Sequence, residues 1–170
     1  MSDLRYPIGP ETSDMPIADA LRIHAEAPAR FREAVRGLND AQLDTPYRPG
    51  GWTVRQVIHH MVDSHMNGYC RTRFALTEEE PAIKAYDEKA WAELADARTL
   101  PVEVSLGVFE GLEHRWVELF RSLTDEQWKR AYKHPERGVV TLEAQAANYA
   151  WHCRHHAAHI TGLRERTGWK

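Results

Sequence analysis

The chain contains, at residues 151–159, the stretch WHCRHHAAH, which holds four of its 10 histidines. The surrounding periodicity predicts one long helix. Because side chains four residues apart lie on one face of a helix, the stretch offers two histidine pairs, His152/His156 and His155/His159. Two imidazoles at this spacing can hold one metal ion from one helix, as in the two-histidine part of the zinc-protease motif.

A helical wheel distinguishes the two pairs. His156 falls inside the arc of large apolar side chains and His152 at its edge, whereas His155 and His159 are rotated toward the polar side. We therefore expect the first pair to face the interior and the second to support it or to be solvated. An inward pair can also be two hydrogen-bonded core histidines, so a metal site needs a third ligand. A zinc peptidase is disfavoured because Cys153 stands where that motif has its general-base glutamate.

Length and composition indicate one globular domain spanning residues 1–170. Hydrophobic residues make up 42% of the chain and charged residues 28%, an ordinary balance for such a domain. The formal net charge of −3, without a basic block, argues against nucleic acid as a partner. We expect no membrane partner, because no apolar signal core or spanning run is present. Cys70 and Cys153 do not suggest a disulfide framework, so we expect a reducing, cytoplasmic location.

Four segments combine helical periodicity with the length of a main helix. They are residues 17–38, 53–76, 101–123 and 141–167. Capping boxes mark two helix starts, Thr53 with Gln56 for the second main helix and Thr124 with Gln127 for a short one. Pro28 either interrupts the first segment or opens its second half, since proline is tolerated in a first turn.

The segments between the main helices are long enough to cross the ends of a bundle. Residues 77–100 include a short predicted helix at 87–94, and residues 132–140 form either a loop or a small hairpin. The predicted fold class is therefore all-α, a four-helix bundle with short additional helices.

The second predicted helix offers three further histidines, His59, His60 and His65. On its wheel His65 falls near the middle of the apolar residues, so the pattern alone predicts that His65 is the buried one. His60 lies away from the apolar centre, on a polar stripe that also contains Thr53, Ser64, Asn67 and Arg71. Such a stripe is either a solvated face or the lining of a polar pocket, and the wheel leaves both open.

Two motifs resemble the DinB/YfiT superfamily. They are residues 43–67, which include LDTPYR and GWTVRQVIHHMVDSHMN, and residues 149–156, YAWHCRHH. Further matches point to the YfiT subgroup and extend the resemblance along almost the whole chain. They lie at residues 4–9, 81–84 and 86–91, at Tyr132 and at His134-Pro135.

The resemblance implies an up-down four-helix bundle, usually a homodimer, that holds a divalent metal at one end through three residues. In the family pattern the first ligand is a histidine eight residues after the tryptophan of the second helix, which maps from Trp52 to His60. The other two are a pair four apart on the last helix, which maps to His152 and His156. The wheel favours this pair independently, whereas His60 as a ligand rests on the resemblance.

Three neutral imidazoles leave a metal its full charge and an open coordination position, as in catalytic zinc sites. We expect one divalent metal per chain, zinc or nickel, although histidine nitrogens also suit iron and copper. An open position can lower the pKa of bound water for hydrolysis or deprotonate a small thiol. The resemblance implies both activities, a metal-dependent hydrolase and an S-transferase that uses a low-molecular-weight thiol such as bacillithiol.

The neighbourhood of the predicted ligands slightly favours thiol transfer. A hydrolase usually needs a positioned carboxylate base, and the turn from His152 to His156 has none. The partner would then be a small-molecule electrophile, or a hydrolysable substrate in the other case. The opposing interpretation is a non-catalytic, stress-associated bundle that only binds metal.

Five other residues are candidates for supporting roles. Those that could orient the ligand imidazoles are Asp63, His155 and His159, and those that could bind an acidic thiol cofactor are Asn67 and Arg71. We expect His65 to be a hydrogen-bonded core histidine and Cys153 to be a small buried residue.

Overall fold

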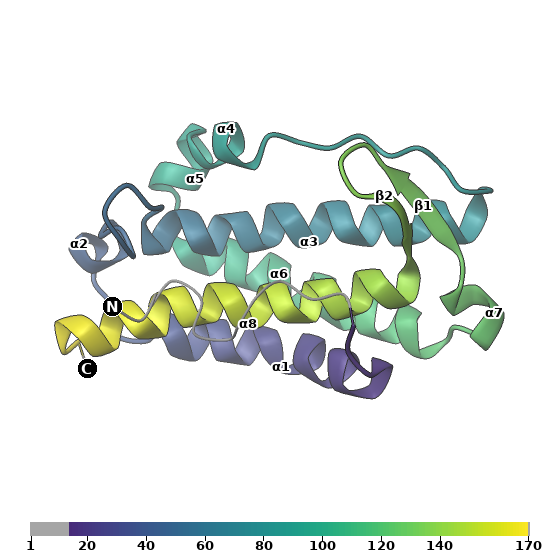
Figure 1. Cartoon of the computed structure of the whole chain (residues 1–170). Coiled ribbons are helices and arrows are strands. Elements are labelled where there is room, and N and C mark those ends of the chain that lie inside the picture. Colours follow the sequence, from purple (N-terminus) through teal and green to yellow (C-terminus); the bar gives the residue numbers. More distant parts are fainter. Residues whose placement is uncertain (1–13, 170) are drawn as a thin grey trace.

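The structure is a computed structural model that describes residues 14–169, so the motif at residues 4–9 lies outside the described part. Four long helices pack side by side (Figure 1). They are α1 (Ile17–Val35), α3 (Val54–Thr77), α6 (Val102–Arg121) and α8 (Leu142–Thr167). The predicted all-α four-helix bundle is confirmed. Within residues 14–169, none of the helices has the length and apolarity needed to cross a membrane.

The four helices run up, down, down, up, rather than alternating as in a simple up-down bundle. Two hydrogen bonds show that α3 and α6 are parallel. His59 is bonded to Ser105 near the starts of the two helices, and Trp116 donates to Thr72 near their ends. The long connection between them runs back along α3 (Figure 1) and returns the chain to the end at which α3 began. α8 then lies antiparallel to α3, which brings the histidines of the two helices together.

Short elements complete the fold. The helices among them are α2 (Asp40–Leu43), α4 (Glu88–Ala92), α5 (Ala95–Thr99) and α7 (Asp125–Trp128). The helix expected at 87–94 is thus α4, and α5 follows it directly. An antiparallel hairpin of β1 (Ala131–His134) and β2 (Gly138–Thr141) precedes α8, so residues 132–140 are a hairpin rather than a loop. Gly138 ends its turn with φ 71°, a conformation that glycine adopts without strain.

Two residues of types that disfavour helix interiors, Pro28 and Gly68, lie inside main helices of the fold. Pro28 lies inside α1, which continues through it as one helix. Gly68 on α3 marks a close approach, because a Cβ atom there would lie 2.4 Å from the Trp116 side chain and 2.6 Å from that of Tyr149. The glycine therefore lets α3 pack tightly on α6 and α8, and this spacing sets how far apart the side chains of α3 and α8 stand.

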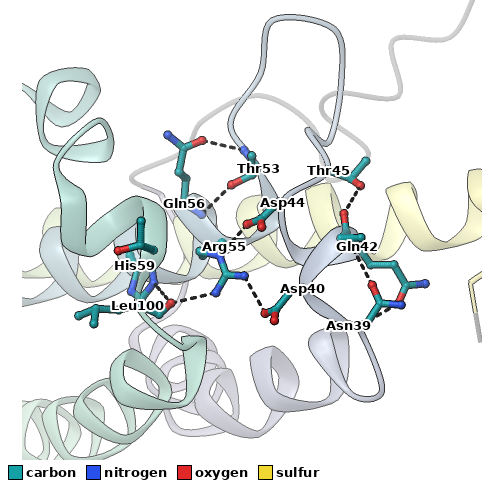
Figure 2. A network of polar contacts seen from close by, with 12 residues as sticks. Asn39, Asp40, Gln42, Asp44, Thr45, Thr53, Arg55, Gln56, His59 and Leu100 are labelled. Carbon is teal, nitrogen blue, oxygen red and sulfur yellow. Dashed lines mark hydrogen bonds and ion pairs between the residues drawn. The ribbon is translucent and has the colours of Figure 1, made fainter.

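A polar network fixes the start of α3 (Figure 2). Arg55 is only 5% exposed, and its guanidinium donates to Asp44 (2.6 Å), to Asp40 (2.9 Å) and to the Leu100 carbonyl (2.9 Å). The same carbonyl lies 3.1 Å from Nε2 of His59. The network ties α2 and the start of α6 to the first turns of α3.

Candidate metal centre and its cavity

Three of the predicted site residues meet where α3 and α8 face each other. His60 comes from α3, and His152 and His156 come from consecutive turns of α8. Their ligand-capable atoms lie within 4.8 Å of one another, and the Nε2 atoms of His60 and His152 are 3.2 Å apart. Two nitrogens that bind one cation at about 2.0–2.1 Å lie roughly 3 Å apart. The spacing therefore fits a shared divalent ion, and it also fits a hydrogen bond between two neutral rings.

All three rings are held in the neutral form. Burial, with a smaller contribution from neighbouring histidines, lowers the pKa of His60 to about 3. Burial likewise lowers the pKa values of His152 and His156 well below the usual range for histidine. Metal ions bind neutral imidazole, so the cluster meets the first chemical requirement of a histidine-ligated cation.

Two nitrogens of this cluster are not committed to protein partners. Nδ1 of His152 and Nδ1 of His156 are buried, and none of the residues 14–169 forms a hydrogen bond with them. Each ring can therefore carry its proton on Nδ1 and present the lone pair of Nε2 without losing a hydrogen bond to the protein. A set of three such nitrogens suits zinc or nickel, so the residues present fit a divalent metal.

The three histidines line part of a cavity of about 740 Å³. Residues of α3 and α8 form its walls, and the β1–β2 hairpin and the segment before α4 also line it. That segment is held to the hairpin by backbone hydrogen bonds of 3.0 Å from Ile83 to Lys133 and 2.9 Å from Lys133 to Pro81. The long α3–α6 connection is thus part of the cavity wall.

An indole covers the histidine end of the cavity. The Trp52 ring centroid lies 4.7 Å from that of His60 and 6.4 Å from that of His156. Trp52 precedes the Thr53 cap of α3, whose capping box is confirmed. The start of the helix therefore positions both the tryptophan and, two turns later, the histidine that it contacts.

The polar stripe of α3 is largely a cavity lining, which resolves the alternative that the wheel left open. His60, Ser64 and Arg71 line the cavity. Asn67 is not among the lining residues, and its amide donates to the Asp63 carbonyl at 2.8 Å. Of the two residues predicted to bind an acidic cofactor, only Arg71 is placed to do so.

Asp63 is half-buried and is not among the residues that line the cavity. Burial, together with the charge of Asp96, raises its pKa to about 6. The acidic residues that do line the cavity are Glu88 and Glu136, and both are exposed. The structure therefore does not bring Asp63 to the three histidines as a supporting carboxylate.

Of the two alternatives that the wheel gave for His155 and His159, the structure excludes the solvated one. Both are buried and line the cavity. His155 stacks on Trp151 with centroids 4.5 Å apart, and His159 stacks on Tyr47 at 4.0 Å. α8 is enclosed both by the bundle core and by the cavity, so its polar side is interior as well.

A second cluster lies deep in the bundle core. It consists of His24, His65 and Glu113, whose ligand-capable atoms also lie within 4.8 Å of one another and which are each no more than 1% exposed. Nδ1 of each histidine lies 2.7 Å from a different Glu113 oxygen. Nε2 of His24 lies 3.2 Å from the Ala146 carbonyl, and Nε2 of His65 lies 3.7 Å from Sγ of Cys153. Every ring nitrogen of this cluster therefore has a protein partner.

These contacts fix where the protons of the core cluster lie. Although burial opposes ionisation, the adjoining His65 and His24 lower the pKa of Glu113 to about 2. Both nitrogens of His24 face oxygen atoms, those of the Glu113 carboxylate and the Ala146 carbonyl, which can accept hydrogen bonds. Burial lowers the pKa of His65 and raises that of the Cys153 thiol, which can then donate to the free Nε2 of His65. The expectations for His65 and Cys153 are confirmed.

Several aromatic residues of the cavity were not identified as site residues from the sequence. They are Tyr47, Tyr86, Tyr132, Tyr149 and Trp151. The sequence contained one relevant signal, the presence of six tryptophans in 170 residues. Because these aromatic residues are scattered along the chain, only the fold reveals which of them share a cavity.

Comparison with known proteins agrees with the geometry. The sequence profile of the DinB superfamily matches residues 23–160. A Bacillus cereus (strain 03BB102) protein named "Putative metal-dependent hydrolase" is 51% identical over 174 residues, which cover 99% of this chain and 100% of that protein. "Putative metal-dependent hydrolase YfiT" of Bacillus subtilis (strain 168) is 49% identical over 173 residues, which cover 98% and 97%.

Two solved structures share the fold. YfiT from Bacillus subtilis, described as "a probable metal-dependent hydrolase with an unusual four-helix bundle topology", superposes with a TM-score of 0.94 at 48% identity over 99% of both chains. A mycothiol-dependent maleylpyruvate isomerase has a TM-score of 0.65 at 18% identity, over 88% of this chain and 61% of that one. At that identity the second match supports the fold alone.

Proposed function

The chain belongs to the DinB superfamily, in the group that contains YfiT, and from this premise we propose that it is a metal-dependent enzyme. His60, His152 and His156 would hold one divalent cation, zinc or nickel. One observation carries the proposal, namely that three neutral imidazoles converge at the wall of a polar cavity. A cation held there would supply a Lewis acid that lowers the pKa of a water or a thiol.

We infer that the nucleophile is a small thiol and that the reaction transfers this thiol to an electrophilic small molecule. A water nucleophile usually needs a general base, and no carboxylate of the described residues hydrogen-bonds to the three imidazoles. A thiol loses its proton more readily than water and needs no such base. Trp52 packs over His60 and His156 and would shield the nucleophile from solvent on that side.

Hydrolysis is the second candidate, because relatives 49–51% identical to this chain are named as metal-dependent hydrolases. The proton of the attacking water would then need an acceptor among the cavity histidines. His155 and His159 are the nearest, with ring centroids 5.1 and 5.3 Å from that of His156.

Activity assays of the zinc-loaded and nickel-loaded protein distinguish thiol transfer from hydrolysis. Thiol transfer is followed with bacillithiol, glutathione and cysteine against 1-chloro-2,4-dinitrobenzene, where a carbon–sulfur bond forms and chloride leaves. Hydrolysis is followed with p-nitrophenyl esters without thiol. We expect metal-dependent thioether formation that is at least a hundredfold slower in His60→Ala. His114→Ala is the matched control, because His114 is an exposed histidine of α6 outside the cavity.

Three other results of these assays would each lead to a different conclusion about the function. Ester cleavage without thiol, lost in His60→Ala, would replace thiol transfer by hydrolysis. Equal rates in His60→Ala and wild type would remove the three histidines from the reaction. Metal binding without turnover of any compound would favour the non-catalytic bundle.

A further inference from the structure

Arg71 is a buried cation that has no anionic partner among residues 14–169. Its side chain lines the cavity, and the residue is 9% exposed. None of the ion pairs formed by residues 14–169 includes Arg71. Its charge acts on the Tyr132 hydroxyl, which places the two groups close together, and most of its five N–H donors have no acceptor among the described residues.

Arg55, on the same helix, shows how a buried arginine is normally accommodated. Arg55 is 5% exposed and is neutralised by Asp40 and Asp44, with a third bond to the Leu100 carbonyl. Burying a guanidinium without such partners is costly, because its lost hydration is not replaced. An unpaired arginine in a cavity wall is therefore placed to bind an anion that enters from solvent.

The rest of the cavity is suited to the same kind of ligand. Its basic residues are Arg48, Arg71, Lys89 and Arg137, and its acidic residues are Glu88 and Glu136. This excess of positive charge contrasts with the net charge of −3 for the whole chain. In addition, Nε1 of Trp151, another lining residue, is buried and has no hydrogen-bond partner among the described residues. An acceptor-rich, negatively charged ligand would satisfy both features.

We propose that Arg71 and Tyr132 form a carboxylate subsite, so that the molecule turned over at the histidines is an elongated small molecule with a carboxylate at its far end. A carboxylate matches the planar, two-pronged geometry of a guanidinium. Arg71 follows His60 by 11 residues on α3, which corresponds to about 16 Å along the helix axis. The histidines would act on one end of the ligand while Arg71 fixes the other. The role of the histidine end rests on the proposed function, whereas the subsite itself does not.

The subsite is tested first without metal, by calorimetric titration with adipate and with 1,6-hexanediol, which lacks the charges. We expect adipate to bind wild-type protein and hexanediol not to bind. Arg71→Met should weaken adipate binding about tenfold or more, since a charged hydrogen-bonding partner is lost. Arg73→Met is the matched control on the same helix, because Arg73 is exposed and contacts Tyr69 instead.

Thermal unfolding distinguishes a ligand-binding role of Arg71 from a purely structural one. We expect Arg71→Met to leave Tm unchanged or to raise it, because the variant removes an unpaired buried charge. Arg71→Gln serves as a second variant that keeps a polar, hydrogen-bonding side chain but not the charge. Equal adipate affinity in wild type and in both Arg71 variants would overturn the proposal, as would the absence of adipate binding.

A series of ω-mercapto carboxylic acids and the matching mercapto alcohols then tests the metal-loaded protein. The acids should bind more tightly than alcohols of the same length, with an optimum chain length, and Arg71→Met should abolish this advantage. If adipate binds but thiols show no dependence on metal, the proposed thiol chemistry fails while the subsite stands. If thiols bind through the metal but acids and alcohols bind equally, the subsite fails and the proposed function stands.

Discussion

Among residues 14–169, metal-capable side chains gather at two places, in the core and at the cavity, where two groups of three share His156. The core cluster and the cavity cluster of His60, His152 and His156 differ in how completely the protein satisfies their hydrogen bonds. In the core, Nδ1 of His24 and Nδ1 of His65 each lie 2.7 Å from a carboxylate oxygen of Glu113, and both rings have further partners. In the cavity, His152 and His156 each have a buried nitrogen without a partner among the described residues. Proximity alone would rank the two clusters equally, since both gather within 4.8 Å.

The difference indicates that a histidine cluster is suited to bind metal when its ring nitrogens are not already hydrogen-bonded to the protein. A metal entering the core cluster would have to displace short hydrogen bonds to Glu113 in a region closed to solvent. A metal entering the cavity cluster would displace at most one contact, between His60 and His152. We therefore propose that the core cluster stabilises the fold and that the cavity cluster binds the metal ion.

The largest expected effect comes from breaking the core cluster. Glu113→Gln replaces the buried carboxylate that faces Nδ1 of both His24 and His65, and breaking such a buried pairing lowers the free energy of unfolding by about 3–5 kcal/mol. Urea unfolding of metal-free protein measures the loss. The control is Glu110→Gln on the same helix, whose ion pair with Arg32 is exposed and should contribute less than about 1 kcal/mol. Equal losses in the two variants would mean that the core cluster stabilises the fold no more than an exposed ion pair does.

The next effect belongs to the cavity cluster and requires metal. Zinc at about a hundredfold excess over its Kd should raise the free energy of unfolding of wild-type protein by about 2.7 kcal/mol. His156→Ala should remove this increment, because it leaves two ligands, while its metal-free stability should change far less than that of Glu113→Gln. Unfolding with and without zinc gives both numbers. An undiminished zinc increment in His156→Ala would place the ion elsewhere.

The smallest effect tests whether Asp63 belongs to either cluster. Its folded-state pKa of about 6 lies above the usual value for aspartate, so the folded state binds the proton more tightly than the unfolded state does. The contribution of Asp63 to stability is therefore fully present below about pH 4 and is lost as the pH rises through 6. Asp63→Asn should stabilise the protein by about 1 kcal/mol at alkaline pH, a value reduced for solvent screening, and by nothing at acidic pH. A large fall in zinc affinity in this variant would instead make Asp63 part of the cavity cluster.

Features of the molecule that depend on local sequence patterns were predicted correctly. Helix periods and capping boxes located the four main helices, and i, i+4 spacing with the family motif gathered His60, His152 and His156. The helix directions were not predictable in this way, because they depend on a connection that runs back along α3 (Figure 1). A helical wheel also assumes one interior face, and α8 has two, which is why the burial of His155 and His159 was missed.

The partners of the core cluster could not be read from the sequence either. Glu113 lies 48 residues from His65 and 89 from His24, and a glutamate on a helix is ordinarily a surface residue. Arg71 is a similar case, since its lack of an anionic partner within residues 14–169 can be seen only in the folded structure.

Elemental analysis of untagged protein tests the central claim most directly. We expect about one divalent ion per chain in wild type and in His59→Ala, whose histidine is already bound to Ser105 and Leu100. We expect loss of the ion in His60→Ala, the neighbouring residue on the same helix, with circular dichroism showing that both variants are folded. If His60→Ala keeps its metal and folded Glu113→Gln loses it, the core cluster holds the ion and our assignment of the two clusters is reversed.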